Sequence, residues 1–286
     1  MILKEKTLPD SGTMVSKGSW RENVINYVLV RQNQDGGYAF AKGLESNVQD
    51  TYYALAILHL LGAPFLNIQR TIRWLHDYSA YNIYEHYYMV ETLRLCSEPP
   101  SKHLQDFIAS LIVSHREFGT IDAYAEIASE FEMTFMVTEI VNILGVKLDK
   151  DNMIKRLLQY KNEEGGFGAH GHSNSNSTYH AVASLFNLGY PVRSLKDTLA
   201  FIRSCEKPTG GFTVVPNTSP PYMEHAYYGV STLDLLGENA KYPEKTAKFV
   251  FRCQNPNGGF ARSDLGISTF EDTFYAVTIL QKIGKL

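Results

Sequence analysis

Residues 254–277 read QNPNGGFARSDLGISTFEDTFYAV and combine a turn signal with a helix signal. Two glycines before an aromatic residue suit a tight reversal of the backbone, because glycine adopts positive φ without steric cost. A polar loop follows, and then Ser268, the carboxylates Glu271 and Asp272 and an apolar segment. The stretch therefore predicts a turn, a loop and a buried helix, in that order.

The same pattern recurs along the chain. QNQDGGYAF at 32–40, KNEEGGFGA at 161–169 and EKPTGGFTV at 206–214 are further copies. An amphipathic segment precedes each copy and an apolar segment follows it. Two more apolar segments, at 84–93 and 131–140, keep the helix pattern without the glycines. Self-similarity of this kind predicts stacked supersecondary units, here six helical hairpins with twelve helices.

One polar position comes into register when the six apolar segments are aligned, with spacings of 35, 47, 45, 48 and 47 residues. The register residues are Asp50, Glu85, Glu132, Ser177, His225 and Asp272. Helices that are apolar nearly all round are expected to be buried, and the amphipathic ones to cover them. Such hairpins can form an open solenoid or a closed ring, and the residues alone leave both open.

Composition excludes several classes of protein. The chain has 286 residues, 44% of them hydrophobic, and a formal net charge of −3, so a nucleic-acid partner is not expected. We expect an N-terminal arm at 1–17, without the apolar run of a signal peptide, and a single domain at 18–286. The odd count of three cysteines fits a reducing compartment, and we expect a cytoplasmic protein.

The Q-N-x-x-G-G-F turn followed by a D-T-x-Y-A-V helix resembles the prenyltransferase/squalene oxidase repeat family. This family includes the β subunits of protein prenyltransferases and squalene–hopene-type terpene cyclases. The resemblance covers about residues 20–283. It implies an all-α fold, a closed α6/α6 toroid of two concentric rings whose central cavity holds an isoprenoid. The turns end in Phe or Tyr where the cyclases carry Trp, which favours the prenyltransferase β subunits.

In such a toroid the starts of the inner helices gather at one end of the cavity. His225, Asp272 and Asp50 would then come from adjacent units and could bind zinc or magnesium. The same surroundings could instead turn one carboxyl into a proton donor. Capping offers a structural alternative for other residues. The predicted capping pairs are Ser46 with Gln49, Asn82 with Glu85, Ser129 with Glu132 and Ser268 with Glu271. Capping leaves Asp50, Glu224, His225 and Asp272 without a structural role.

The two branches of the family imply different chemistry. The zinc ligands of the prenyltransferases, Asp-x-Cys and His, fall on Ser175, Ser177 and His225, so one of three is kept. The cyclases' acid, the middle Asp of Asp-x-Asp-Asp-Thr, falls on Gln49 in the first unit and on Glu271 in the last. The catalytic candidates are Glu271, Asp272, Asp50 and Glu224. The prenyltransferases bind the diphosphate through a clamp of basic residues in the loop of the Gly-Gly turn. The residues of this chain that resemble the clamp are His170, His172, Lys42 and Arg262.

Aromatic residues are numerous, with eighteen tyrosines and fifteen phenylalanines, and many lie on the apolar segments. Aromatic faces stabilise cationic centres, which suits carbocation-like prenyl chemistry. The predicted substrate-binding residues are Tyr52, Tyr179, Tyr227, Tyr228 and Tyr275. Small residues at one matching position would leave room for a ligand. They are Ala54, Ala181, Gly229 and Ala276.

We therefore predict an isoprenoid-handling enzyme that acts on a prenyl, most often diphosphate, substrate in a central aromatic cavity. Contact with a membrane surface would come through the substrate. One alternative is a protein prenyltransferase β-type subunit that works with a helical α partner. Another is a non-catalytic toroid that binds a lipid or a protein.

Overall fold

The computed structural model describes residues 19–114 and 130–286. The predicted arm at 1–17 and the predicted cap residue Ser129 lie outside the described residues. The described part of the chain forms twelve α-helices and two short 3-10 helices. The odd-numbered helices are α1 (Trp20–Leu29), α3 (Ile68–Asp77), α5 (Lys102–Ser114), α7 (Lys150–Gln159), α9 (Lys196–Cys205) and α11 (Pro243–Arg252). The even-numbered helices are α2 (Val48–Leu60), α4 (Ile83–Leu95), α6 (Glu130–Leu144), α8 (Ser175–Asn187), α10 (Met223–Leu235) and α12 (Phe270–Lys282). The 3-10 helices are η1 (Ala169–Gly171) and η2 (Val192–Ser194).

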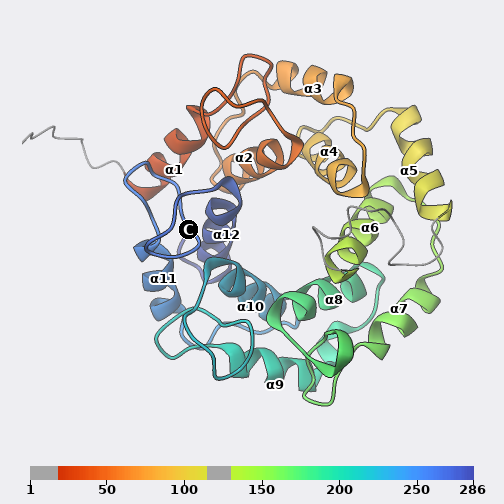
Figure 1. Ribbon diagram of the computed structural model, residues 1–286, viewed down its shortest axis with the longest axis vertical. Helices are drawn as coiled ribbons and strands as arrows, with labels where there is room; N and C mark the ends of the chain where they lie inside the picture. The colour runs from red at the N-terminus through yellow and green to blue at the C-terminus, as the bar shows by residue number, and fades with distance from the viewer. Residues whose placement is uncertain (1–18, 115–129) are drawn as a thin grey trace, which may run out of the picture.

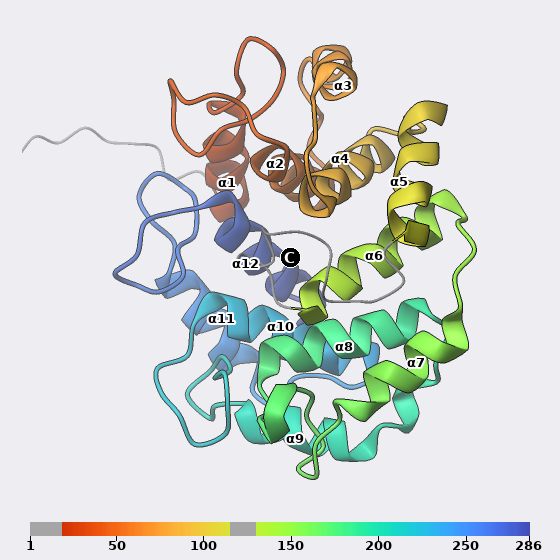
Figure 2. The ribbon, with the colours of Figure 1, turned by 45° about the vertical axis from the view of Figure 1, so that its right-hand side comes forward.

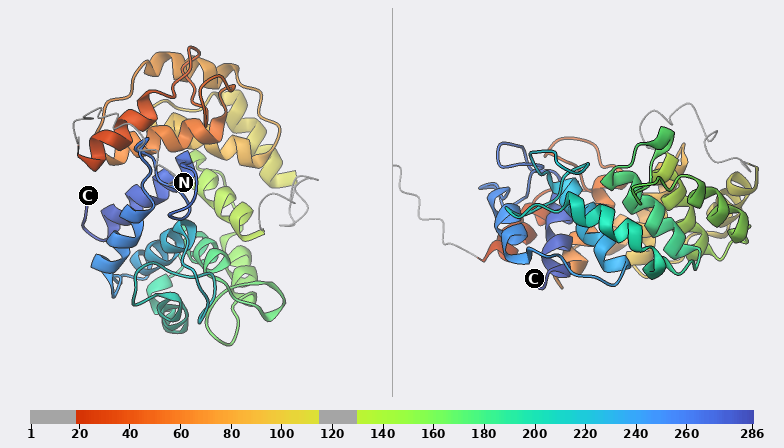
Figure 3. Two further views of the ribbon diagram at one scale, coloured as in Figure 1. Left: turned by 60° about the vertical axis from the view of Figure 1, so that its left-hand side comes forward. Right: turned by 90° about the horizontal axis from the view of Figure 1, so that it is seen from below.

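The even-numbered helices form an inner ring and the odd-numbered helices an outer one (Figure 1). Each inner helix packs against the next, and α12 packs against α2, so the inner ring is closed. Viewed from below, the two rings form a flat disc (Figure 3). The closed α6/α6 toroid is therefore confirmed, and the open solenoid is excluded. None of the helices in the described ranges has both the length and the apolar character needed to cross a bilayer.

The aromatic residue of each Gly-Gly turn is a plug between the two rings. Tyr38, Phe167, Phe212 and Phe260 have no exposed surface. In three of these turns a threonine on the following inner helix accepts a hydrogen bond from the N–H of the aromatic residue, as where Thr273 Oγ1 accepts from the Phe260 N–H at 2.9 Å. The small residue Gly229 makes room for such a plug, because a Cβ there would lie 2.2 Å from the Phe212 ring. The expectation that Gly229 leaves room for a ligand is therefore wrong.

The first glycine of each turn meets the next outer helix. Gly36, Gly165, Gly210 and Gly258 have φ between +92° and +101°. A Cβ at Gly165 would lie 2.3 Å from the carbonyl oxygen of Asp197 at the start of α9. Only glycine permits both this left-handed conformation and such close backbone contact. The turns are therefore joints that hold neighbouring outer helices together.

The last joint closes the molecule on its own first helix. A Cβ at Gly258 would lie 2.2 Å from the carbonyl oxygen of Asn23 in α1. The Tyr27 hydroxyl donates to the Ser268 carbonyl at 3.3 Å, across 241 residues of sequence. The rings of Trp20 and Phe251 pack edge to face at 5.7 Å. Figure 2 shows α1 and α12, red and blue, at this seam.

Candidate ligand-binding cavity

Six aromatic side chains form a closed belt around the centre of the inner ring, one from each inner helix. The members of this aromatic belt are Tyr52, Tyr87, Phe135, Tyr179, Tyr227 and Phe274. Neighbouring ring centroids lie 5.4–6.2 Å apart all the way round. Tilted and edge-on pairs at such distances are favourable. The belt therefore lines the inner ring with aromatic surface and keeps its centre open.

The belt surrounds a cavity of about 200 Å³. Its lining comprises Tyr52, Tyr53, Tyr87, Tyr88, Glu91, Arg94, Glu132, Phe135, Met136, Glu139, Tyr179, His180, Tyr227, Tyr228, Phe274 and Tyr275. All five predicted substrate-binding tyrosines are in this list, so the structure brings them together around one space. Their role in binding a substrate stays a prediction.

Burial keeps the tyrosines and the histidine of the cavity wall neutral. It raises the pKa of the Tyr52 and Tyr179 phenols well above the usual value, with smaller contributions from nearby charged groups. It lowers the pKa of His180 to about 3, so this imidazole carries no charge at neutral pH. The tyrosines of the belt therefore line the cavity as uncharged phenols.

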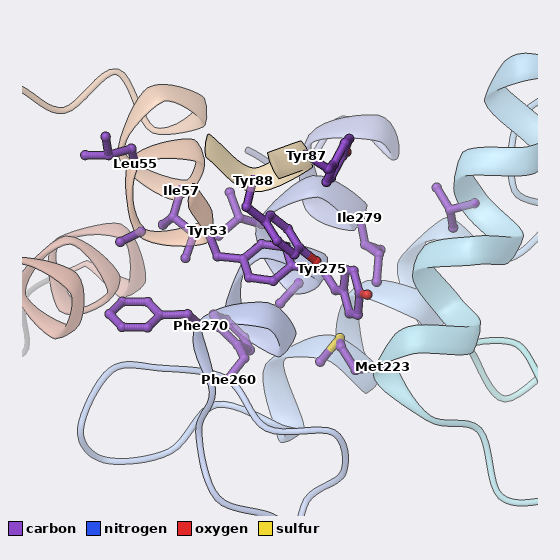
Figure 4. Close-up of a cluster of buried hydrophobic side chains, with 14 of the residues drawn as sticks. Tyr53, Leu55, Ile57, Tyr87, Tyr88, Met223, Phe260, Phe270, Tyr275 and Ile279 are labelled. Atoms are coloured by element: carbon purple, nitrogen blue, oxygen red, sulfur yellow. Dashed lines mark hydrogen bonds between the residues drawn. The ribbon is translucent and has the colours of Figure 1, made fainter. Parts of the chain in front are cut away.

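Glu271 is the carboxylate that the tyrosines hold in place at the amino-terminal end of the inner helices. Its Oε1 accepts hydrogen bonds from the hydroxyls of Tyr275 at 2.9 Å and Tyr53 at 3.1 Å. The Tyr53 and Tyr88 hydroxyls lie 3.2 Å apart, and Figure 4 shows the rings of these two residues near Tyr275. The carboxyl group is thus fixed to two side chains that line the cavity, by hydrogen bonds that use one of its oxygens.

Asp272 and Asp50 have structural partners. The N-cap residue of α12 is Thr269, whose hydroxyl accepts from the Asp272 N–H at 2.9 Å and donates to the Asp272 carboxylate at 2.7 Å. Asp50 stands in the same way to the N-cap residue Asn47 of α2, and it also accepts from the Phe40 N–H at 2.8 Å. Both carboxylates therefore stabilise helix starts, and their predicted catalytic role stays untested.

The predicted capping pairs in the first and last units are wrong by one residue. Ser268 is bonded to Asn255 and Asn257 of the Gly-Gly turn, so it does not cap α12 with Glu271. Ser46 is bonded to Asn33 in the same manner. The interpretation that Glu271 caps and frees Asp272 is thus reversed: Asp272 caps, and Glu271 bonds to the tyrosines.

Glu224 and His225 lie at the start of the neighbouring helix α10. Arg262 donates from Nε to the Glu224 carboxylate at 2.7 Å and stacks over the Tyr222 ring at 4.2 Å. His225 Nε2 lies 3.7 Å from the same carboxylate, and burial lowers the pKa of this imidazole. Arg262 is therefore paired within the protein, and its part in a diphosphate clamp stays a prediction.

The predicted metal ligands His225, Asp272 and Asp50 do not form a site. Residues 19–114 and 130–286 contain no group of three or more His, Cys, Asp or Glu side chains that could hold a metal ion. Asp50 and Asp272 bond to the N-cap residues of their own helices, whereas the buried His225 Nδ1 has no hydrogen-bond partner in the described part of the chain. The residues present in this region therefore do not fit a zinc or magnesium centre, and no step below uses one.

Charged residues at the other end of the cavity were missed by the sequence analysis. Glu91, which is 3% exposed, is paired with Arg94 at 2.7 Å. Glu139 accepts from the Asn187 side-chain amide at 2.7 Å. A charged residue inside a segment as apolar as 84–93 was the available signal, since burying a charge is costly unless it has a partner or a function.

The match of a family model supports what the architecture indicates. The model of the prenyltransferase α/α-toroid domain matches residues 10–82 and 77–285. The chain therefore belongs to this family. Among the curated proteins, none matches the chain.

Two kinds of solved structure share the fold. The protein geranylgeranyltransferase-I of Candida albicans, solved with GGPP, has a TM-score of 0.70 and 15% identity over 92% of this chain and 90% of that chain. A variant of the type II terpene cyclase MstE from Scytonema, solved with its substrate geranylgeranyl dihydroxybenzoate, has a TM-score of 0.61 and 13% identity. The match covers 93% of this chain and 96% of the cyclase. At such identities the likeness concerns the fold alone.

Proposed function

We propose that this chain is an enzyme that binds the hydrocarbon part of an isoprenoid in the central cavity and converts it by acid-started cyclisation. The aromatic belt supplies apolar surface for the chain and π-faces for the positive charge that develops on carbon during such a reaction. The toroid neighbours are crystallised with geranylgeranyl compounds, which supports this class of ligand.

The observation that carries the proposal is the geometry of Glu271. Tyr53 and Tyr275, two tyrosines of the cavity wall, donate to its Oε1, which leaves Oε2 as the oxygen from which the proposed acid would donate. Donation to one oxygen of a protonated carboxyl helps the group release the proton from the other. The expected first step is transfer of this proton to an alkene carbon of the substrate. The alkene then becomes a carbocation, and the carboxylate that remains stays bonded to Tyr53 and Tyr275.

The test replaces this carboxyl with an amide. Glu271→Gln keeps the length of the side chain and an oxygen for the two phenols, but it has no carboxylic proton. We expect the purified wild type to form cyclic products from geranylgeraniol or geranylgeranyl diphosphate, and the variant to form them at least about 100-fold more slowly. Products are identified by gas chromatography with mass spectrometry.

A matched control separates the acid from general effects of losing a carboxylate. Glu244→Gln changes a residue of the outer helix α11 that is paired with Lys285. It should keep the wild-type rate. Equal rates in wild type and Glu271→Gln would contradict the role of the acid. Failure of the wild type to cyclise any C15 or C20 alcohol or diphosphate would contradict the enzymatic proposal.

A further inference from the structure

The charges around the cavity are strongly unequal. Glu91 and Glu139 are among the described lining residues, against the single guanidinium of Arg94. That guanidinium is within 2.7 Å of Glu91, so the attraction that it offers to an anion is already used by a carboxylate. Among the described lining residues His180 is the other group able to carry a positive charge, and burial keeps it neutral.

The pKa values of the cavity tyrosines reflect this negative environment. Glu91 and Glu139 raise the pKa of the Tyr52 phenol beyond the effect of burial, because a phenolate there would be repelled by both carboxylates. For Tyr227, whose pKa is raised to about 12, Glu139 and Glu271 add to the effect of burial. An anion placed inside the belt would meet the same repulsion.

The belt itself has the dimensions of a cation site. Its six centroids are separated from their neighbours by 5.4–6.2 Å. In a regular hexagon the distance from the centre to a corner equals the side, so a group at the centre of such an arrangement would lie about 6 Å from each ring centroid, the distance at which a cation over a ring face is attracted to it. The faces of tyrosine rings attract positive charge and repel negative charge.

We propose that the cavity selects its ligand by the charge of the head group, and takes an isoprenoid with an uncharged or cationic head in preference to one with a diphosphate. The proposal rests on the proposed function for the isoprenoid part of the ligand. The choice of head group rests on the belt and on Glu91 and Glu139, which would lie around that head. A diphosphate, with its multiple negative charges, would compete with Glu91 for Arg94, the one cationic side chain among the described lining residues.

The experiment compares probes that share one farnesyl chain. Isothermal titration calorimetry measures the dissociation constants of N,N-dimethylfarnesylamine, farnesol and farnesyl diphosphate with the full-length protein at neutral pH. We expect the amine to bind most tightly, and at least about tenfold more tightly than the diphosphate. Glu139→Gln should weaken binding of the amine and leave binding of farnesol unchanged. Glu91→Gln should do the same, and Glu139→Gln keeps the test valid if loss of the Arg94 partner disturbs folding.

The outcomes separate this inference from the proposed function. A diphosphate that binds as tightly as the amine, or carboxylate variants with no effect on the amine, would overturn the charge selection and leave isoprenoid binding intact. A fourth probe, dodecyltrimethylammonium, has the cationic head without an isoprenoid chain. If it binds while all three farnesyl compounds fail to bind, the charge selection stands and the isoprenoid proposal falls. Glu244→Gln on the outer ring is the control and should behave as wild type.

Discussion

Asp272 is an ionisable residue, and the fold buries its carboxyl group where the charged form is unfavourable. It is 9% exposed, and its carboxylate accepts from the Thr269 hydroxyl at the start of α12. Burial raises its pKa from 3.8 to about 7, Thr269 opposes the rise, and Glu271 and Glu224 add to it. The folded state therefore favours the protonated carboxyl, although the hydrogen bond from Thr269 favours the carboxylate.

This shift predicts a stability that depends on pH. The folded state binds the proton more tightly than the unfolded chain does, so the group stabilises the fold fully below pH 3.8 and loses this contribution as the pH rises to about 7. Asp272→Asn should remove that dependence. In urea unfolding, the free energy of the variant relative to wild type should increase by about 1–3 kcal/mol between pH 5 and pH 8.

Asp264→Asn, which changes an exposed carboxyl in the same loop, is the control for charge. A difference between Asp272→Asn and wild type that stays constant with pH would contradict the assigned shift. The same outcome would show that Thr269 compensates the burial of the carboxylate.

The incorrect prediction that Ser268 and Glu271 cap α12 has a simple physical origin. Ser268 with Glu271 and Thr269 with Asp272 both fit the spacing of a capping box, and the sequence gives no reason to prefer either. One residue along a helix is a rotation of about 100°. A shift of one position therefore exchanges the side chain that caps α12 with the one that bonds to Tyr53 and Tyr275.

At the scale of elements, the first glycine of each turn connects one hairpin to the next. Gly165 has φ +92° and lies directly against the backbone of Asp197 in α9. Thr198 Oγ1 donates to the Gly165 carbonyl at 2.7 Å, which fixes the joint from the other side. The contact involves backbone on both sides, so it cannot be relieved by rotation of a side chain.

Gly165→Ala should therefore lower the free energy of unfolding by more than the strain of a left-handed backbone conformation alone. Gly189 provides a matched control, because it has φ +87° and an added Cβ there would meet nothing within 4 Å. We expect Gly189→Ala to lose about 1–2 kcal/mol of unfolding free energy from the left-handed conformation alone. Gly165→Ala should lose about 3 kcal/mol or more. Equal losses in chemical denaturation would show that the joint relaxes around the methyl group.

The sequence repeat allowed the helices to be predicted, but it did not show which of their side chains contact one another. Periodicity placed α4, predicted at 84–93 and observed at Ile83–Leu95, within two residues, because apolar patterns report burial directly. The packing of Gly229 against Phe212 could not be predicted from periodicity. A small residue marks close approach on one side of a helix, and the sequence does not say whether a ligand or Phe212 occupies that side.

For the whole molecule, the seam at which the last hairpin meets the first makes a ring from a row of hairpins: α12 packs against α2, and the turn after α11 packs against α1. Gly258 joins α1 as Gly165 joins α9, and Gln254 Nε2 donates to the Trp20 carbonyl at 3.5 Å. The family resemblance implied closure, whereas the repeat alone left an open solenoid equally acceptable. Closure depends on contacts between chain ends, which no local pattern encodes.

Gly258→Ala should open the seam before the rest of the molecule. Hydrogen exchange followed by mass spectrometry should show faster exchange in α1 than in wild type, while α7 and α9 keep their protection. Gly165→Ala should give the complementary pattern, with α9 affected and α1 protected. Uniform acceleration over all helices in Gly258→Ala would show that the seam opens only with global unfolding.

The seam also has a consequence for how the chain reaches its native state. Neighbouring hairpins can form early because their contacts are local, whereas the bond from Tyr27 to Ser268 spans 241 residues and its loop closes at a high entropic cost. Before closure, an arc of hairpins exposes two complementary ends. The ends of different chains fit each other as well as the two ends of one chain do, and such head-to-tail contacts propagate. Refolding from urea should therefore yield monomeric rings in dilute solution and a rising share of soluble oligomers at high protein concentration, measured by size-exclusion chromatography with light scattering.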